Sequence, residues 1–206
     1  MSIEIELKYS VNEAFARQLL KQQHLGPYPL THFQTVEIVD RYYDTANGHL
    51  AQKGYALRLR KQHQNVILQL KSLTTVQGAL HRREELNIPV QDTDPDHWPN
   101  APATELLKTL LDGHPMQELL TIHQRRHVAP LLNQQNQAFA QLSLDEVLWK
   151  VAGHMDRAWE LEIELLPDAD ETQLQELERL LEDKLNMRPQ PLSKFERGLA
   201  LVGRSP

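Results

Sequence analysis

The segment Trp159-Glu160-Leu161-Glu162-Ile163-Glu164-Leu165 alternates strictly between apolar and acidic residues. Because successive side chains of a β-strand point to opposite faces, it predicts a strand with one apolar face and one face of glutamates. Like charges that share a strand face repel each other, by about a few tenths of a kcal/mol for each pair. A solvated face would explain one such strand, since antiparallel sheets often expose one side to water.

The same pattern recurs nearer the N-terminus. The clustered faces are Glu4, Glu6 and Lys8 in residues 2–9, Arg58 and Arg60 in 55–62, Gln69 and Lys71 in 65–71, and Arg83 and Glu85 in 79–88. A chain that accepts this repulsion on several strands is expected to use those faces. The signs are also segregated: residues 46–83 carry seven Lys or Arg and no acid, whereas residues 160–183 carry ten acids and one base. This segregation indicates a site with two kinds of charge.

The strand and helix patterns indicate an α+β fold. We expect strands at 2–9, 33–43, 55–62, 65–71, 79–88, 121–130, 138–145 and 158–166, and helices at 12–23, 103–112, 170–186 and from near Ser193. About eight strands with few helices between them suggest an antiparallel sheet that could close into a barrel. With 206 residues and no Gly/Ser linker, residues 1–206 are expected to form a single domain.

Composition narrows the class of protein. The chain is 40% hydrophobic and 24% charged, as in ordinary soluble proteins. It contains no cysteine, which excludes disulfides, zinc–thiolate sites and thiol catalysis. The N-terminus lacks the pattern of a signal peptide, and no apolar run approaches the ~18 residues of a membrane span. We therefore expect a cytoplasmic protein with no membrane partner, and the net charge of −6 argues against DNA as a partner.

A barrel would give the charged faces a common purpose. If they point inward and the apolar faces lie outward under flanking helices, the interior becomes a polar tunnel. Its bases could bind a polyanion, since the planar guanidinium of arginine donates two hydrogen bonds to phosphate at once. Its carboxylates could hold Mg²⁺ or Mn²⁺, which prefer oxygen ligands. Bases and acids would then each have a partner.

Glu4-Ile5-Glu6-Leu7-Lys8 resembles the Glu-x-Glu-x-Lys motif of the CYTH family, the triphosphate tunnel metalloenzymes. Matching segments follow in order along nearly the whole chain: Tyr42-Tyr43-Asp44-Thr45, Leu57-Arg58-Leu59-Arg60, Leu70-Lys71, His81 to Glu85, Glu160 to Glu164, and Leu192-Ser193-Lys194 with Arg197-Gly198. The length and the His-x-Arg segment are most similar to the bacterial inorganic triphosphatases. Many proteins of that branch continue into a second, helical domain.

The resemblance implies a closed eight-stranded antiparallel tunnel, a single tunnel domain over 1–206, and a metal-dependent enzyme that takes Mg²⁺ or Mn²⁺. It implies metal binding by Glu4, Glu6, Glu160 and Glu162, phosphate binding by Lys8, Arg58, Arg60, Lys71, Arg83, Arg126 and Lys194, and catalytic roles for Lys8 and Glu6. Arg125 is expected to face the other way from Arg126. The segment Leu144-Asp145-Glu146-Val147 resembles the family's acidic turn but lacks the usual glycine, and the roles of Asp145, Glu164 and Arg197 stay open.

The expected activity is hydrolysis of inorganic tripolyphosphate to pyrophosphate and phosphate. Other reactions on the same tunnel remain alternatives: a class IV adenylyl cyclase, a thiamine triphosphatase, or a nucleoside or RNA triphosphatase. A further alternative is a polyphosphate-binding module without catalysis. The double set of carboxylates argues against that alternative, because binding alone would need only the bases. The sequence leaves the oligomeric state and the number of metal ions open.

Overall fold

The structure, a computed structural model, describes residues 2–73, 76 and 78–203. Its strands are β1 (Ser2–Val11), β2 (His24–Leu25), β3 (Tyr28–Pro29), β4 (Gln34–Thr45), β5 (Tyr55–Gln62), β6 (Asn65–Ser72), β7 (Leu80–Val90), β8 (Met116–Leu132), β9 (Ala138–Val151), β10 (His154–Leu165) and β11 (Arg188–Pro189). Its helical segments are α1 (Glu13–Leu19), α2 (His49–Gln52), η1 (Pro95–His97), α3 (Pro102–Leu111), α4 (Glu171–Arg179), η2 (Leu180–Lys184) and α5 (Lys194–Ala200).

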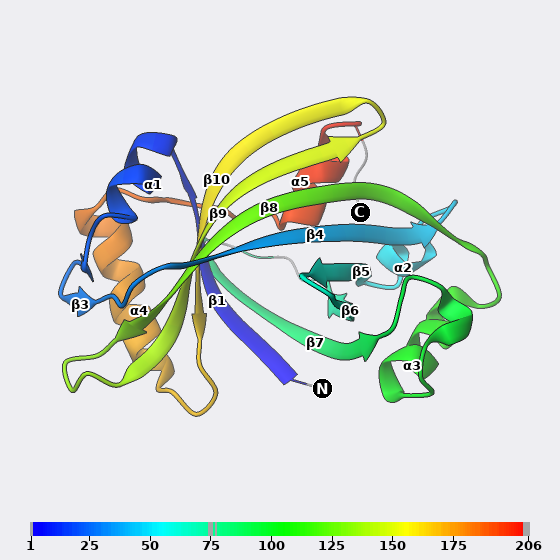
Figure 1. The fold of residues 1–206 in the computed structure, drawn as a ribbon, viewed down its shortest axis with the longest axis horizontal. Helices are drawn as coiled ribbons and strands as arrows, with labels where there is room; N and C mark the ends of the chain where they lie inside the picture. The colour runs from blue at the N-terminus through cyan, green and yellow to red at the C-terminus, as the bar shows by residue number, and fades with distance from the viewer. Residues whose placement is uncertain (1, 74–75, 77, 204–206) are drawn as a thin grey trace.

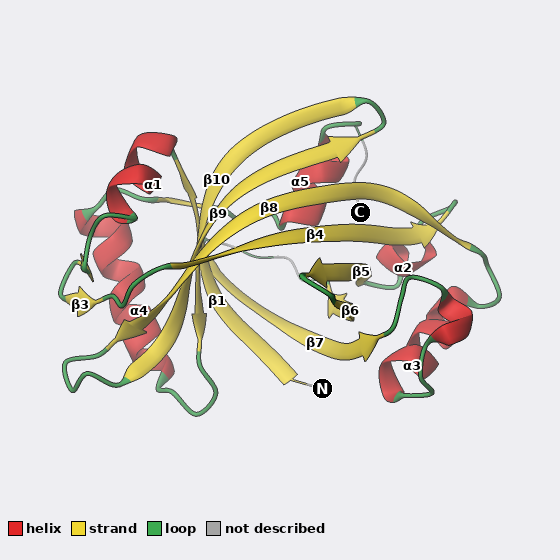
Figure 2. Cartoon of the chain, viewed as in Figure 1, coloured by secondary structure: helices red, strands yellow, loops and turns green. Residues whose placement is uncertain are grey.

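The long strands form one closed antiparallel barrel, as the sequence predicts. Neighbouring strands follow the order β10-β9-β8-β4-β5-β6-β7-β1, and pairing of β1 with β10 closes the ring of eight. The short β11 pairs with the end of β1 at Tyr9 and Ser10. Figure 1 shows α1 and α4 at one end of the barrel, α2 and α3 at the other, and α5 beside the ribbons of β8, β9 and β10. Figure 2 shows how strands dominate the middle of the molecule.

The predicted strands and helices are present, but some of their bounds were wrong. The largest error lies between 145 and 158, where β9 and β10 extend into a long hairpin. Ala152 and Gly153, both with positive φ, make its turn. Gly153 was the available signal, because glycine tolerates this conformation. The helix expected at 12–23 ends at Leu19, and that expected at 170–186 changes at Leu180 into a π-helical turn.

The apolar faces of the strands lie on the outside of the barrel, covered by helices. On β1 and β10, Leu7 and Ile163 are fully buried in a cluster with Leu177 of α4. On β5 and β6, Leu57 and Leu70 pack in a second cluster with residues of α2 and α3. Burying a leucine is worth about 1.5–3 kcal/mol, so these faces fix which way each strand points. The alternate, charged faces are thereby turned into the barrel.

Helix α5 closes part of the barrel with a third apolar cluster. Phe195 stacks on Tyr42 with ring centroids 4.9 Å apart. Ser193 caps the helix: its side chain accepts from the Glu196 N–H, while the Glu196 carboxylate accepts from the Ser193 N–H. The helix therefore begins at a fixed residue, with Lys194 in its first turn. Among the described helices, none has the length and apolar character needed to cross a membrane.

Candidate active site

A charged cavity of about 210 Å³ lies inside the barrel. Its wall includes every residue predicted to bind phosphate: Lys8, Arg58, Arg60, Lys71, Arg83, Arg126 and Lys194. These bases come from five strands, β1, β5, β6, β7 and β8, and from α5. The wall also includes the carboxylates Glu4, Glu6, Glu85, Glu162 and Glu164. Strand alternation and the position of α5 thus bring residues as far apart in the sequence as Glu4 and Lys194 onto one concave surface.

Three of the four predicted metal carboxylates line this cavity and are paired with bases. Glu4 accepts two hydrogen bonds from the Lys71 Nζ at 2.9 and 3.0 Å. Glu6 accepts from Arg83, and its Oε1 lies 3.1 Å from the Lys8 Nζ. Such pairing keeps the acids ionised: burial alone would raise the pKa of Glu4, but the Lys71 ammonium lowers it below its ordinary value.

Lys8 lies between a carboxylate of β1 and a carboxylate of β10. Its Nζ is 3.1 Å from Glu6 and 3.1 Å from Glu162. Across the β1–β10 junction Lys8 lies directly opposite Glu162, and Glu6 lies opposite Glu164. The closure of the barrel therefore creates the acidic group, because the two strands that meet there both carry alternating glutamates.

The fourth predicted metal carboxylate, Glu160, does not lie where the sequence analysis placed it. Its side chain is fully buried, and the described cavity wall does not include it. Instead Lys194 and Arg197 contact its two oxygens at 2.8 and 2.9 Å. Glu164, which alternation places on the same strand face, lines the cavity in its stead.

Glu164 differs from the other acids because no hydrogen bond or ion pair reaches it from the part of the chain that the structure describes. Burial, together with the charges of Glu4 and Glu6, raises its pKa to about 7. Repulsion of this kind is relieved by a cation, and carboxylate oxygens are the ligands that Mg²⁺ and Mn²⁺ prefer. In chemical type, the carboxylates of Glu4, Glu6, Glu162 and Glu164 therefore suit a divalent metal. Among the described residues no three such groups converge on one point, since Glu4, Glu6 and Glu162 are turned toward Lys and Arg partners.

Arg58 and Arg60 are held from behind by an acid that sequence reasoning missed. Asp40 of β4 is fully buried and accepts two hydrogen bonds from Arg60, at 2.7 and 2.8 Å, and one from Gln124 at 2.6 Å. Arg58 donates to it at 3.3 Å. Burial opposes its ionisation, but the Arg58 and Arg60 guanidinium groups hold the pKa of Asp40 well below its usual range. The only feature of the sequence that pointed to Asp40 was its position, two residues before Tyr42 and so on the same strand face.

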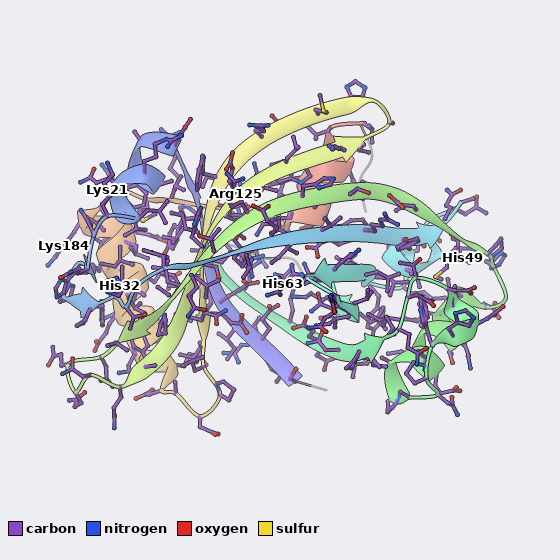
Figure 3. All side chains as sticks on the ribbon, viewed as in Figure 1. Lys21, His32, His49, His63, Arg125 and Lys184 are labelled. Atoms are coloured by element: carbon purple, nitrogen blue, oxygen red, sulfur yellow. The ribbon has the colours of Figure 1, made fainter. Side chains whose placement is uncertain are left out.

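Arg126 lines the cavity, whereas its neighbour Arg125 is exposed and pairs with Glu37 at 2.8 Å. Arg125 is labelled in Figure 3 beside the ribbons of β9 and β10. Arg126 donates to both oxygens of Asp145, at 2.8 and 2.6 Å, and to Glu162. Asp145 is fully buried on β9 and lies outside the described cavity wall. The acidic segment without the usual glycine thus supplies a partner for a cavity base.

The chain is similar in sequence to known proteins. The sequence matches the CYTH domain model over residues 2–199. It is 32% identical over 87 residues to the inorganic triphosphatase of Haemophilus influenzae, a match that covers 42% of this chain and 24% of that protein. The chain thus matches about a quarter of the length of this curated relative.

Solved structures show the same fold at low identity. A candidate adenylate cyclase from Bacillus halodurans gives a TM-score of 0.63 at 20% identity, covering 96% of this chain and 98% of that one. HpAC1 from Hippeastrum, a candidate adenylyl cyclase with a dominant triphosphatase activity, gives a TM-score of 0.61 at 23% identity, covering 96% and 95%. Because the family model spans nearly the whole sequence and the barrel matches these folds, this chain belongs to the CYTH family.

Proposed function

We propose that this chain is a divalent-metal-dependent triphosphatase that hydrolyses inorganic tripolyphosphate to pyrophosphate and phosphate. CYTH family members are triphosphatases or cyclases. The observation that supports hydrolysis of a bare phosphate chain is the cavity wall, where seven Lys or Arg side chains and five glutamates meet. The bases suit a polyanion and the acids suit a metal that accompanies it.

The size of the cavity favours an inorganic substrate. Its volume of about 210 Å³ is below the roughly 300–1,000 Å³ of pockets that enclose drug-sized ligands. A nucleoside would need apolar walls and additional room, whereas a phosphate chain needs only charge partners spaced along the tunnel. We infer that binding energy is concentrated on the phosphates, and that a nucleoside adds little to it.

Each group of residues has a distinct task in the proposed reaction. Arg58, Arg60 and Arg83 bind phosphate oxygens and neutralise charge as the terminal bond breaks. Lys8, held between Glu6 and Glu162, is placed to orient the attacking water or to stabilise the departing oxygen. A metal held by the cavity carboxylates would act as a Lewis acid and lower the pKa of a bound water. Most of the catalysis would then come from positioning and electrostatics.

A substrate panel tests the proposal. Phosphate release from tripolyphosphate, ATP and pyrophosphate would be measured with Mg²⁺, with Mn²⁺ and with excess chelator, alongside an assay for cyclic AMP. We expect kcat/KM for tripolyphosphate to exceed that for ATP by about tenfold or more, which is roughly 1.4 kcal/mol of transition-state stabilisation. Chelator should abolish turnover. Equal use of ATP, or formation of cyclic AMP, would overturn the inorganic substrate, and turnover in chelator would overturn the metal.

A metal titration tests the carboxylates. Glu164→Gln keeps the side-chain volume but removes a charge from the acidic group. We expect Mn²⁺, titrated by paramagnetic resonance without substrate, to bind at least tenfold more weakly to this variant. Glu37→Gln, which changes an exposed glutamate on β4, is the matched control and should bind Mn²⁺ like the unaltered protein. Equal affinity in all three proteins would remove Glu164 from the metal site.

A further inference from the structure

Glu160 and Arg197 form a pair behind the cavity wall. The Glu160 carboxylate is fully buried, with Oε2 accepting from the Arg197 Nη1 at 2.9 Å. Its Oε1 lies 2.8 Å from the Lys194 Nζ, an ion pair that lacks hydrogen-bond alignment. Both oxygens are therefore taken by bases of α5, one helical turn apart. The oxygens of Glu4 and Glu162 are also paired with bases, but those two side chains line the cavity, whereas Glu160 lies outside the described cavity wall.

Trp149 fixes the same turn of α5. The Arg197 guanidinium lies over its indole ring, with Cζ 4.4 Å from the ring centroid. The indole Nε1 donates to the Lys194 carbonyl at 2.8 Å. Gly198 permits this close approach, since a Cβ at that position would meet Leu120 at 2.9 Å and Trp149 at 3.0 Å. The backbone at Lys194 and the side chain of Arg197 are thus held by one buried ring.

Lys194 is the member of this group that reaches the cavity. Its Nζ contacts three carboxylates: Glu162 at 2.6 Å, Glu160 at 2.8 Å and Asp145 at 2.9 Å. All three are shared with other bases: Asp145 also pairs with Arg126, Glu160 with Arg197, and Glu162 with both Lys8 and Arg126. Sharing matters for function. An ammonium whose charge is fully matched by its own carboxylates attracts phosphate weakly, whereas one whose carboxylates are shared keeps net positive charge.

We propose that Arg197 and Glu160 are positioning residues for Lys194: Glu160 anchors the ammonium from behind, and Arg197 neutralises Glu160 so that Lys194 can bind phosphate. Glu160 is then part of the phosphate-binding half of the site and not a metal ligand. This inference rests on the proposed function in assuming that the cavity takes a phosphate chain. It assigns a task to Arg197, which is absent from the cavity wall.

Two measurements without turnover separate this role from the alternatives. Calorimetric titration of inorganic tripolyphosphate in excess chelator measures the affinity that the bases provide without metal. Mn²⁺ titration without phosphate reads the metal site alone. We expect Arg197→Met to bind tripolyphosphate about tenfold more weakly and Mn²⁺ unchanged. Arg197→Lys restores a charge beside Glu160 and should recover most of the affinity. Arg125→Met, which removes an exposed arginine outside the cavity, is the matched control and should bind both like the unaltered protein.

Glu160→Gln tests the reassignment of the acid. It should leave Mn²⁺ affinity within about twofold, whereas Glu162→Gln should weaken it at least tenfold. Because a lone neutral residue beside two buried bases could unfold the protein, Glu160→Gln combined with Arg197→Met provides a charge-balanced second variant, with the same expected result. Loss of Mn²⁺ binding in the folded double variant would make Glu160 a metal ligand and overturn the inference.

The outcomes for Arg197 are equally distinct. If Arg197→Met lowered the melting temperature but left the tripolyphosphate affinity unchanged, Arg197 would only stabilise the position of α5, and the inference would be overturned. An Arg197→Lys variant that recovers no affinity would overturn the neutralising role. Failure of the proposed function would be seen elsewhere, as absence of tripolyphosphate turnover by the unaltered protein with metal, and it would leave both binding measurements interpretable.

Discussion

At the scale of single residues, the site depends on acids that the substrate would never touch. Asp40 and Asp145 are fully buried, lie off the described cavity wall, and each orient a cavity arginine through two hydrogen bonds. Paired guanidinium groups without such partners would repel each other and sample many rotamers. A buried carboxylate behind them fixes their geometry before any ligand arrives, which reduces the entropic cost of binding.

Asp40→Asn tests this arrangement. The substitution removes the charge that balances Arg58 and Arg60, and breaking a buried pair typically costs about 3–5 kcal/mol. We expect a loss of this order at pH 7 by urea unfolding. Since the pKa of Asp40 is depressed in the folded state, its contribution is present above its unfolded pKa, about 3.9, and is lost as the pH falls further below that value. The difference between the two proteins should therefore shrink on acidification below pH 4, and a difference that grew there would contradict the assignment.

At the scale of elements, strand alternation explains why so much was predictable. The period-two pattern gave each strand an inner and an outer face, so the six predicted phosphate-binding residues that lie on strands reach one cavity, where Lys194 of α5 joins them. Alternation does not say how far along the barrel a residue lies, because that depends on the stagger of the strands. Glu160, Glu162 and Glu164 share a face, yet α5 covers the first of them. Long-range contacts of this kind, like Asp40 behind Arg60, leave no local pattern in the sequence.

Helix α5 is short, and its position depends on close packing at Gly198. We predict that Gly198→Val pushes the helix off Trp149 and lowers the free energy of unfolding by about 1–3 kcal/mol. It should also weaken tripolyphosphate binding, because Lys194 moves with the helix. Ala200→Val places the same residue on the exposed side of α5 and should cost only about half a kcal/mol. Equal effects from the two variants, measured by urea unfolding and calorimetry, would show that close approach of the helix is unimportant.

At the scale of the whole molecule, the cavity has the opposite sign from the protein. The chain carries a net charge of −6, but the cavity wall carries more bases than acids. Clefts with one dominant sign and low-dielectric walls concentrate field lines and attract the opposite charge. A small polyanion would thus be drawn to the cavity, whereas a large one such as DNA would also meet the acidic exterior.

This charge arrangement predicts that phosphate and metal each stabilise the fold. Tripolyphosphate in excess chelator would neutralise the bases, and Mn²⁺ alone would neutralise Glu164 and its neighbours. At a concentration 100 times its dissociation constant, a ligand specific for the folded state adds about 2.7 kcal/mol. For a chain of this size that corresponds to a rise in melting temperature of roughly 5–10 °C. Differential scanning fluorimetry can measure both shifts. Potassium chloride at matched ionic strength controls for screening, which would weaken like-charge repulsion throughout the molecule and not only in the cavity. If tripolyphosphate raised the melting temperature no more than this salt does, the seven bases would not act together on one anion. That result would contradict the proposal that the tunnel binds a phosphate chain.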